Sequence, residues 1–175
     1  ANLCERAQKK PVREGLLIGP GGLCDYVIVN TGYLFKIPDT LSYEEASLTE
    51  PLACVVHSVT KANIQLGEDV VVIGGGIMGQ YHVMLAKRRG ARVIMSEVDE
   101  SRRALARKLG ADITFNPMEK DPVEYVKSLT EGRGADVVFN TTAIPSVVPQ
   151  AIAMTGKAGR MIQYSSMHPD APAPV

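Results

Sequence analysis

The chain has 175 residues, of which 45% are hydrophobic, and its 19 basic residues balance 19 acidic ones. This length suits one domain, or one domain with part of another, and the apolar content is enough for a core. The balanced charge argues against a broad basic field for nucleic acid or anionic membranes. The sequence also lacks an apolar run of about 18 residues, the length of a membrane-spanning helix. We therefore expect neither a nucleic acid nor a membrane as a partner.

The chain has three cysteines, Cys4, Cys24 and Cys54. Three are too few for a disulfide framework, and the first residues show no apolar signal region. Both features are typical of a cytoplasmic protein. We expect Cys24 and Cys54 to be buried, because a free cysteine packs as a small hydrophobic residue.

The first part of the chain consists of short segments separated by turn residues. After the turn cluster Gly19–Gly22, residues 25–29 (DYVIV) and 33–38 (YLFKIP) are predicted to be strands. Two strands are too few to form a domain of their own.

Two helices are predicted next. Ser42 and Glu45 form a capping box, in which a serine is followed by a glutamate three residues later. Pro51 suits the first position of the second helix, where its missing N–H group would have no partner anyway. The apolar side of this second helix is expected to carry Leu52, Val55, Val56 and Val59.

From Asp69 onward, strands and helices alternate. Several strands are nearly continuous apolar runs, which suit a parallel sheet that is buried on both faces. The segments between them have apolar residues at helical spacing. This alternation predicts an α/β fold with a doubly wound parallel sheet and right-handed crossovers. The predicted strands are residues 70–74, 92–98, 112–115, 135–141 and 160–165.

The strongest motif is the sequence GGGIMG, in which Gly74, Gly76 and Gly79 match the pattern G-x-G-x-x-G. It follows a predicted strand and opens a predicted helix, the context in which the motif binds a dinucleotide. Gly74 allows a tight turn, Gly76 lets a pyrophosphate approach the backbone, and Gly79 allows the helix to pack closely on the strand. The helix N-terminus then offers free N–H groups to the phosphates.

A carboxylate is expected near the adenosine ribose of such a dinucleotide, and Glu97 lies 23 residues after Gly74. It would accept hydrogen bonds from the ribose hydroxyls of NAD and repel the 2′-phosphate of NADP. Arg102 is expected to lie over the adenine or the ribose. The alternative is that Arg102 is a solvent-exposed helix arginine beside Arg103. Either arginine could in principle hold a 2′-phosphate.

Several stretches, taken in order, resemble the zinc-containing medium-chain alcohol dehydrogenases, in particular the branch with sorbitol and threonine dehydrogenases. They are GGLCDYVIV, YLFKIPDTLSYEEASLTEPLACVVHS, the glycine motif and SEVDESRRALARKLGAD. The resemblance covers nearly the whole chain. It implies a Rossmann domain in residues 46–175, incomplete at its C-terminus, preceded in residues 1–45 by a remnant of a β-rich, GroES-like catalytic domain.

The resemblance also implies which residues contact the cofactor. Met78 would lie beside the pyrophosphate, and Tyr164 with its two following serines would lie near the nicotinamide. In many relatives the stretch 140–143 contains an aspartate and a glycine; this chain has NTTA there, which puts contacts at Thr142 and Ala143 in doubt. The full set of expected cofactor-binding residues is Gly74, Gly76, Ile77, Met78, Gly79, Glu97, Arg102, Tyr164, Ser165 and Ser166.

Two residues are implicated in zinc binding by the resemblance. Glu50, by itself only a carboxylate near a helix start, looks like the acidic residue that binds or borders the catalytic zinc, directly or through water. Cys4 looks like the last of four cysteines around a structural zinc, which it cannot hold alone. His57, His82 and His168 lie outside the family's ligand motif, so no catalytic residue is expected within this chain, and alone it should be inactive.

The full enzyme is expected to transfer hydride between NAD and a secondary alcohol, such as a polyol or sugar derivative, with zinc as a Lewis acid. A small alcohol or ketone would be its substrate. Two alternatives remain: a non-enzymatic NAD-sensing module, and a zinc-free NADPH-dependent quinone reductase, which Glu97 disfavours. We also expect a homo-oligomer, because an unpaired edge of the strand at 160–165 would template pairing with another chain unless an ordered segment covers it.

Overall fold

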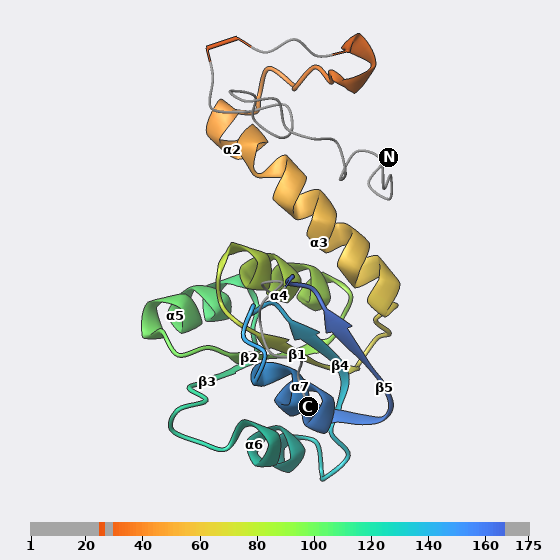
Figure 1. Cartoon of the computed structure of the whole chain (residues 1–175), viewed down its shortest axis with the longest axis vertical. Coiled ribbons are helices and arrows are strands. Elements are labelled where there is room, and N and C mark those ends of the chain that lie inside the picture. The colour runs from red at the N-terminus through yellow and green to blue at the C-terminus, as the bar shows by residue number, and fades with distance from the viewer. Residues whose placement is uncertain (1–24, 27–29, 167–175) are drawn as a thin grey trace, which may run out of the picture. The chain divides into compact units, whose positions relative to one another are not determined.

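The computed structural model describes residues 25–26 and 30–166 (Figure 1). The chain divides into two compact units, Ala1–Ala46 and Ser47–Val175. Within the described residues of the first unit lies a 3₁₀ helix, η1 (Thr31–Tyr33), and helix α2 (Tyr43–Ser47) runs from this unit into the second. No helix in the described part of the chain is long and apolar enough to cross a membrane.

The strand predicted at residues 33–38 is wrong. Tyr33 ends η1, and residues 34–38 form neither helix nor strand. The side chain of Asn30 accepts a hydrogen bond from the Gly32 N–H at 2.8 Å. This local bond favours a turn over an extended strand. Of the other predicted strand, Asp25 and Tyr26 belong to no strand, and residues 27–29 lie outside the described residues.

The capping box is confirmed at the start of α2. The Glu45 N–H donates to Ser42 Oγ at 3.1 Å, and the Ser42 N–H donates to the Glu45 carboxylate at 3.0 Å. Helix α3 (Thr49–Ala62) begins two residues earlier than predicted, which places Pro51 third rather than first. Proline is tolerated there because no N–H of the first turn has an intrahelical partner. Val55 is buried as expected, but Val56 is 46% exposed.

The second unit contains a five-stranded parallel sheet in the order β3-β2-β1-β4-β5. This topology confirms the predicted doubly wound fold. The strands are β1 (Asp69–Ile73), β2 (Arg92–Ser96), β3 (Ile113–Phe115), β4 (Ala135–Asn140) and β5 (Thr155–Gln163). The helices between them are α4 (Ile77–Arg88), α5 (Glu100–Leu109), α6 (Pro122–Leu129) and α7 (Val147–Met154).

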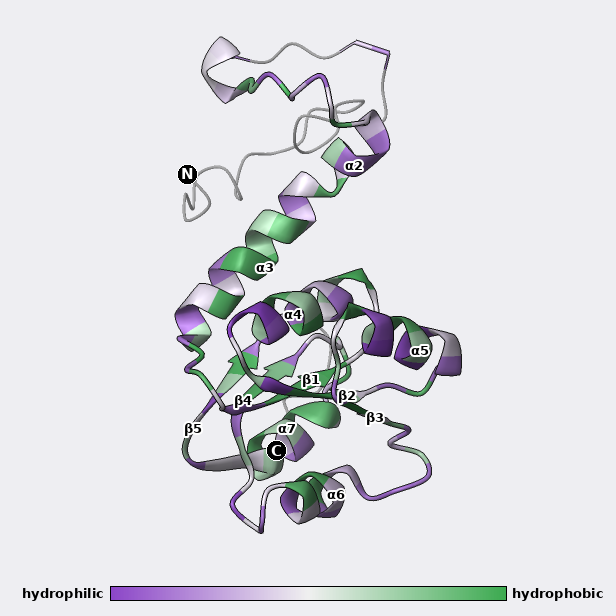
Figure 2. Ribbon diagram, turned by 180° about the vertical axis from the view of Figure 1, so that it is seen from behind, coloured by the Kyte–Doolittle hydropathy of each residue, from purple (hydrophilic) through white to green (hydrophobic). Residues whose placement is uncertain are grey.

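Helices cover both faces of the sheet. Helices α3, α4 and α5 lie on one face, and α6 and α7 lie on the other (Figure 1). Alternate residues of β1 point to opposite faces, so Val72 packs in the cluster with α3 and α4, and Val71 packs in the cluster with α6 and α7. Figure 2 shows the hydrophobic strands between these two layers of helices. The core therefore lies on both sides of a central, fully buried β1.

An arginine from β5 closes the end of α3. The guanidinium of Arg160 donates to the carbonyls of Ala62 and Asn63 at 3.0 and 3.2 Å. It also forms a two-pronged ion pair with Glu68, at 2.7 and 2.8 Å, which lowers the pKa of that carboxyl. These bonds satisfy carbonyls that a helix C-terminus leaves without partners. They tie α3 to the far edge of the sheet.

Two isoleucines provide a matched test of this core. Ile94 in β2 is fully buried, and Ile152 in α7 is 59% exposed. We expect Ile94→Ala to lower the free energy of unfolding by about 2–5 kcal/mol, because it removes buried methyl groups and leaves a cavity. Ile152→Ala should change it by no more than about 0.5 kcal/mol. Urea denaturation of both variants measures the difference, and equal losses would contradict the proposed packing.

Candidate cofactor-binding site

The candidate site lies where the direction of winding changes in the sheet. Strands β1 and β4 are neighbours, but the helices that follow them, α4 and α7, lie on opposite faces. In the strand register, Ile73 is level with both Ser96 and Asn140. The chain therefore leaves β1, β2 and β4 at one common edge. A crevice at such carboxyl ends is the usual ligand site of an open α/β sheet.

The glycines of the motif have different structural roles. Gly74 has a φ of +95°, and a Cβ there would lie 2.7 Å from Thr141 Oγ1. A Cβ on Gly79 would lie 1.8 Å from the Gly74 carbonyl oxygen, so only glycine lets α4 pack this closely on β1. A Cβ on Gly76 would have nothing within 4 Å. The space in front of Gly76 is open to a ligand, as the motif predicts.

The N-terminus of α4 has no protein group that caps it through a side chain. Its N-cap is Gly76, and its first turn contains no acidic residue. By contrast, α5 and α6 begin at Asp99 and Asp121, whose carboxylates accept backbone N–H bonds of the first turn. The first N–H groups and the positive end of the helix dipole of α4 are thus suited to an external anion.

Glu97 is held against the glycine turn. Its side chain is 5% exposed, one carboxylate oxygen accepts the Gly75 N–H at 2.5 Å, and the other accepts the Asp99 N–H at 2.9 Å. A Cβ on Gly75 would lie 2.8 Å from Glu97 Cγ, so this position also needs glycine. The sequence interpretation missed that role, although three consecutive glycines were its signal. An ionised carboxylate has about four acceptor sites, so the ribose hydroxyls could still be bound.

The two arginines after Glu97 differ in their environment. The Arg102 side chain is 57% exposed, and its guanidinium lies 3.9 Å from the Glu97 carboxylate. The Arg103 side chain is only 11% exposed; it donates to the carbonyls of Glu97 and Val98 and pairs with Glu100. The Arg103 guanidinium therefore holds the backbone that follows β2 and is not free to meet a 2′-phosphate. Only Arg102 presents its charge to solvent at this place.

A buried glutamine joins the glycine turn to α5. The amide of Gln80 donates to the carbonyls of Gly75 and Arg102, each at 2.9 Å. The Gln80 carbonyl oxygen is buried and has no hydrogen-bond partner among the described residues. Gln80 follows the last glycine of the motif and is not part of its pattern, so the sequence carried no signal for this role.

An amide network closes the site at the ends of β4 and β5. Asn140 is fully buried; it donates to the Gln163 side chain at 2.9 Å and accepts from the Thr142 N–H and hydroxyl at 3.1 and 2.8 Å. Gln163 donates to the Ser165 carbonyl, and the Ser165 hydroxyl donates to the Thr142 carbonyl. The amide of Asn140 suits this network because its N–H group donates to the acceptor of Gln163 and its oxygen accepts from Thr142.

The residues expected near the nicotinamide are partly brought together. The Tyr164 hydroxyl donates to Met78 Sδ at 3.4 Å, which joins the end of β5 to the first turn of α4. Burial, followed by the nearby Cys54 and Glu50, raises the pKa of Tyr164, so its hydroxyl keeps its proton. Ile77 is 62% exposed beside the glycine turn, and Ser166 is exposed as well.

Of the two residues expected at zinc sites, Glu50 lies in the described part of the chain, and its role beside a catalytic zinc stays a prediction. Glu50 is exposed in the first turn of α3, where it accepts a hydrogen bond from the Cys54 thiol at 3.4 Å. This bond raises the pKa of the thiol. Cys54 was expected to be buried, and it is exposed instead because α3 turns it away from the sheet. No group of three His, Cys, Asp or Glu in residues 25–26 and 30–166 could hold a metal. Cys4, Cys24 and His168 lie outside the described residues.

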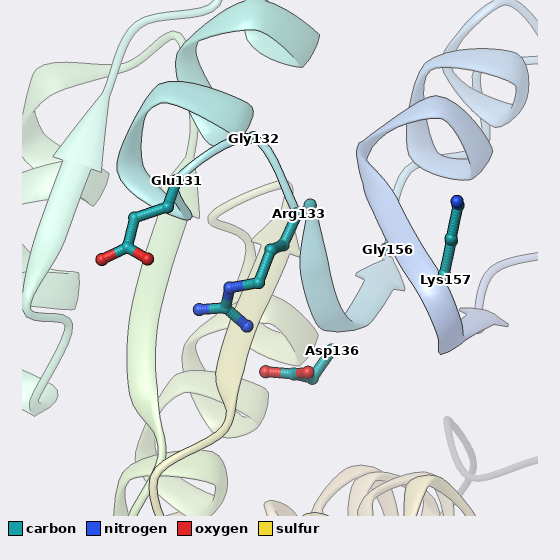
Figure 3. Close-up of a pocket in the computed structure, with 7 residues that line it drawn as sticks. Glu131, Gly132, Arg133, Asp136, Gly156 and Lys157 are labelled. Atoms are coloured by element: carbon teal, nitrogen blue, oxygen red, sulfur yellow. The ribbon is translucent and has the colours of Figure 1, made fainter.

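Hollows on the described surface of the second unit include two of similar volume. One, of about 420 Å³, lies beside the glycine turn and is bordered by Gly76, Tyr81 and Leu105 of the α4–α5 side. The other, of about 440 Å³, lies at the opposite edge of the sheet, where β4 and β5 begin. Figure 3 shows that Glu131, Arg133, Asp136 and Lys157 line it. Its acidic and basic side chains offset each other, so charge does not define a ligand there.

The parallel sheet, the glycine turn before α4 and the carboxylate after β2 together define a dinucleotide-binding domain of the Rossmann type. Residues 78–175 match the family described as zinc-binding dehydrogenase, and the chain belongs to this family.

Individual relatives agree with this assignment. The chain is 36% identical to the D-arabitol-phosphate dehydrogenase of Enterococcus avium, over 93% of its own length and 46% of the relative's. It is 33% identical to the sorbitol dehydrogenase of Bacillus subtilis, over 81% and 40%. A putative zinc-binding dehydrogenase from Sinorhizobium meliloti, solved bound to NADP, superposes with a TM-score of 0.73 at 29% identity, over 81% of this chain and 42% of that one. The chain spans about half the length of the curated relatives it matches.

Two glycine variants separate folding from binding. Gly76 has φ −67° and ψ −175°, which alanine adopts freely, and its Cβ would meet no atom within 4 Å. We expect Gly76→Ala to change the free energy of unfolding by less than about 1 kcal/mol but to obstruct a dinucleotide. Gly79→Ala should cost about 3 kcal/mol or more, because α4 must move away from Gly74. Urea denaturation and calorimetric titration with NAD test both; a stable Gly79→Ala variant would contradict the close packing.

Proposed function

We propose that this chain is the cofactor-binding portion of a zinc-dependent oxidoreductase that transfers hydride between NAD and a secondary alcohol, such as a polyol or sugar derivative. One observation carries the proposal: the uncapped α4 N-terminus at Gly76 and the buried carboxylate of Glu97 lie at the same edge of the sheet. This pairing suits a ligand that has both a pyrophosphate and a ribose. The relatives are named as polyol and alcohol dehydrogenases, which favours an enzyme over a binding-only sensor or a quinone reductase.

In this proposal the nicotinamide supplies the hydride chemistry, and the protein supplies binding and orientation. The open space at Gly76 admits the pyrophosphate, and the N–H groups of the first turn of α4 bind it. The Glu97 carboxylate accepts hydrogen bonds from the ribose hydroxyls, while the hydrogen bonds from the Gly75 and Asp99 N–H groups keep the carboxylate from rotating. The described residues do not form a zinc site, so no step of the reaction is assigned to zinc-binding side chains here.

The same geometry supports NAD as the cofactor. Glu97 would meet the 2′-phosphate of NADP with a like charge, and Arg103 is already bound to backbone carbonyls. Arg102 is the remaining cation, and it lies beside the same carboxylate that would repel the phosphate. The Sinorhizobium meliloti protein was solved with NADP, which makes this choice a property to be measured for the present chain.

The cofactor preference is tested at Glu97. We expect Glu97→Ala to weaken NAD binding by roughly 1.5–3 kcal/mol, the value of a hydrogen bond to a charged group, and to narrow the gap between NAD and NADP. Calorimetric titration of both cofactors into both proteins gives the values. Arg102→Ala is the matched control, because it removes the neighbouring charge without removing the ribose acceptor. Equal or tighter binding of NADP by the wild-type chain would show that Arg102 sets the preference instead.

A second expectation concerns activity. The 175-residue chain should bind NAD but should not oxidise polyols when zinc is added, because its described residues form no metal site. Calorimetry with NAD, followed by an NADH absorbance assay with sorbitol and related polyols, separates the two properties. Zinc-dependent turnover would overturn the assignment of the chemistry to other parts of the enzyme, and failure to bind NAD would overturn the proposed function.

The proposal extends to partners and location. A small alcohol or ketone is the substrate that the family relationship favours. Strand β5 pairs with β4 on one side, and within residues 25–26 and 30–166 no strand pairs with its other side. That edge supports a homo-oligomer. The cytoplasmic location expected from the cysteine content remains a prediction.

A further inference from the structure

His82 is a fully buried histidine that the proposed cofactor contacts leave unused. It lies in α4, one turn after Met78. Its Nδ1 atom is 2.8 Å from the Met78 carbonyl, and its Nε2 atom is 2.9 Å from Ser58 Oγ. A carbonyl can only accept, so Nδ1 carries the proton and Nε2 accepts from the Ser58 hydroxyl. Both ring nitrogens are thus occupied, and the tautomer follows from the partners.

The imidazole also packs between two aromatic rings. Its centroid is 4.5 Å from that of Phe139 in β4 and 4.8 Å from that of Tyr164, which it meets edge to face at 80°. Burial lowers the pKa of His82 to about 4, so the ring is neutral near pH 7. The ring therefore lies at a point where α3, α4, β4 and the end of β5 meet.

Met78 is held at both ends by this group of residues. Its carbonyl accepts from His82, and its sulfur accepts from the Tyr164 hydroxyl at 3.4 Å. A methionine side chain has three rotatable bonds and is normally adaptable. Here its position is restricted beside the glycine turn, on the side of the site where β5 ends.

Ser58 extends the same contact to α3. Glu50, Cys54 and Ser58 are spaced by four residues and lie along one stripe of that helix. The Ser58–His82 bond therefore fixes how this stripe sits against α4. After burial, the groups that raise the pKa of Tyr164 are Cys54 and Glu50 of this same stripe.

We propose that His82 is a positioning residue for the nicotinamide end of the cofactor. Together with Tyr164 it fixes Met78 as a rigid wall for the nicotinamide ring, and through Ser58 it locks α3 to the cofactor-binding turn. The inference rests on the proposed function and adds a role for His82 and Ser58, which are not among the residues expected to contact the cofactor. It requires that a substitution of His82 weaken the binding of the nicotinamide half of NAD and leave the binding of the ADP-ribose half unchanged.

The test compares NAD with ADP-ribose, which lacks the nicotinamide. Calorimetry gives the Kd of each ligand for the 175-residue chain and its variants. We expect His82→Leu to weaken NAD binding by about five- to tenfold, the effect of one lost hydrogen bond, and to leave ADP-ribose binding unchanged. His82→Gln should restore NAD binding, because a glutamine can donate to the Met78 carbonyl and accept from Ser58. His57→Leu is the matched control, because His57 is exposed on α3 beside Ser58.

Each outcome of these titrations supports or overturns the role inferred for His82 or the proposed function. An equal loss for both ligands, or no loss for either, would show that His82 only fills the core and would overturn the inference. If His82→Leu does not fold, Tyr164→Phe gives the same test, because it removes one hydroxyl from a partly exposed residue; it should weaken NAD binding alone. A wild-type chain that binds neither ligand would instead overturn the proposed function. Wild-type binding of ADP-ribose and NAD with equal affinity would overturn the inference only.

Discussion

The close approach of α4 to the end of β1 is the constraint on which the site depends. A Cβ on Gly79 would overlap the Gly74 carbonyl oxygen at 1.8 Å, so the helix can start this near the strand only with glycine at both positions. The approach places the helix N-terminus at the carboxyl end of β1, beside the hollow bordered by Gly76 and Leu105. It also brings the Gly75 N–H within reach of Glu97, which joins the first two strand ends. The close approach of α4 to β1 therefore sets both the direction of the helix N-terminus and the position of the Glu97 carboxylate at this edge of the sheet.

The charges around the site are arranged by hydrogen bonds to the backbone rather than by simple ion pairing. Glu97 is buried but accepts two backbone N–H groups, which is the condition for burying a carboxylate at low cost. Arg103 supports the same segment through its carbonyls. The result is an acidic group in a fixed orientation, with one solvent-exposed cation, Arg102, beside it. A ligand therefore meets a buried, hydrogen-bonded acceptor and an exposed donor.

The fold and the centre of the site could be predicted because they depend on local patterns. Apolar runs identified the five strands, and the spacing of Gly74 and Glu97 placed the two ends of the site. Predictions failed where the outcome depends on a partner distant in sequence. Residues 33–38 look like a strand, but no partner strand lies among the described residues. Asn140 meets Gln163 across two strands, a contact that has no spacing signal. Arg103 folds back on the carbonyl of Glu97, only six residues earlier, so its role depends on the direction of its side chain.

The contact between Arg160 and the end of α3 bears on the order in which the chain folds. The Ala62 carbonyl accepts from Arg160, 98 positions later, and the Asn63 carbonyl accepts both from Arg160 and from the nearby Gln65 amide. During synthesis, α3 and β1 emerge well before β5, so the Ala62 carbonyl gains this partner only when β5 joins the sheet. Contacts of such sequence separation form late and slow folding. A chain halted before Arg160 would expose the glycine turn before α4 without strand β5 at the edge of the sheet. Such a chain would be a target for chaperones and proteases.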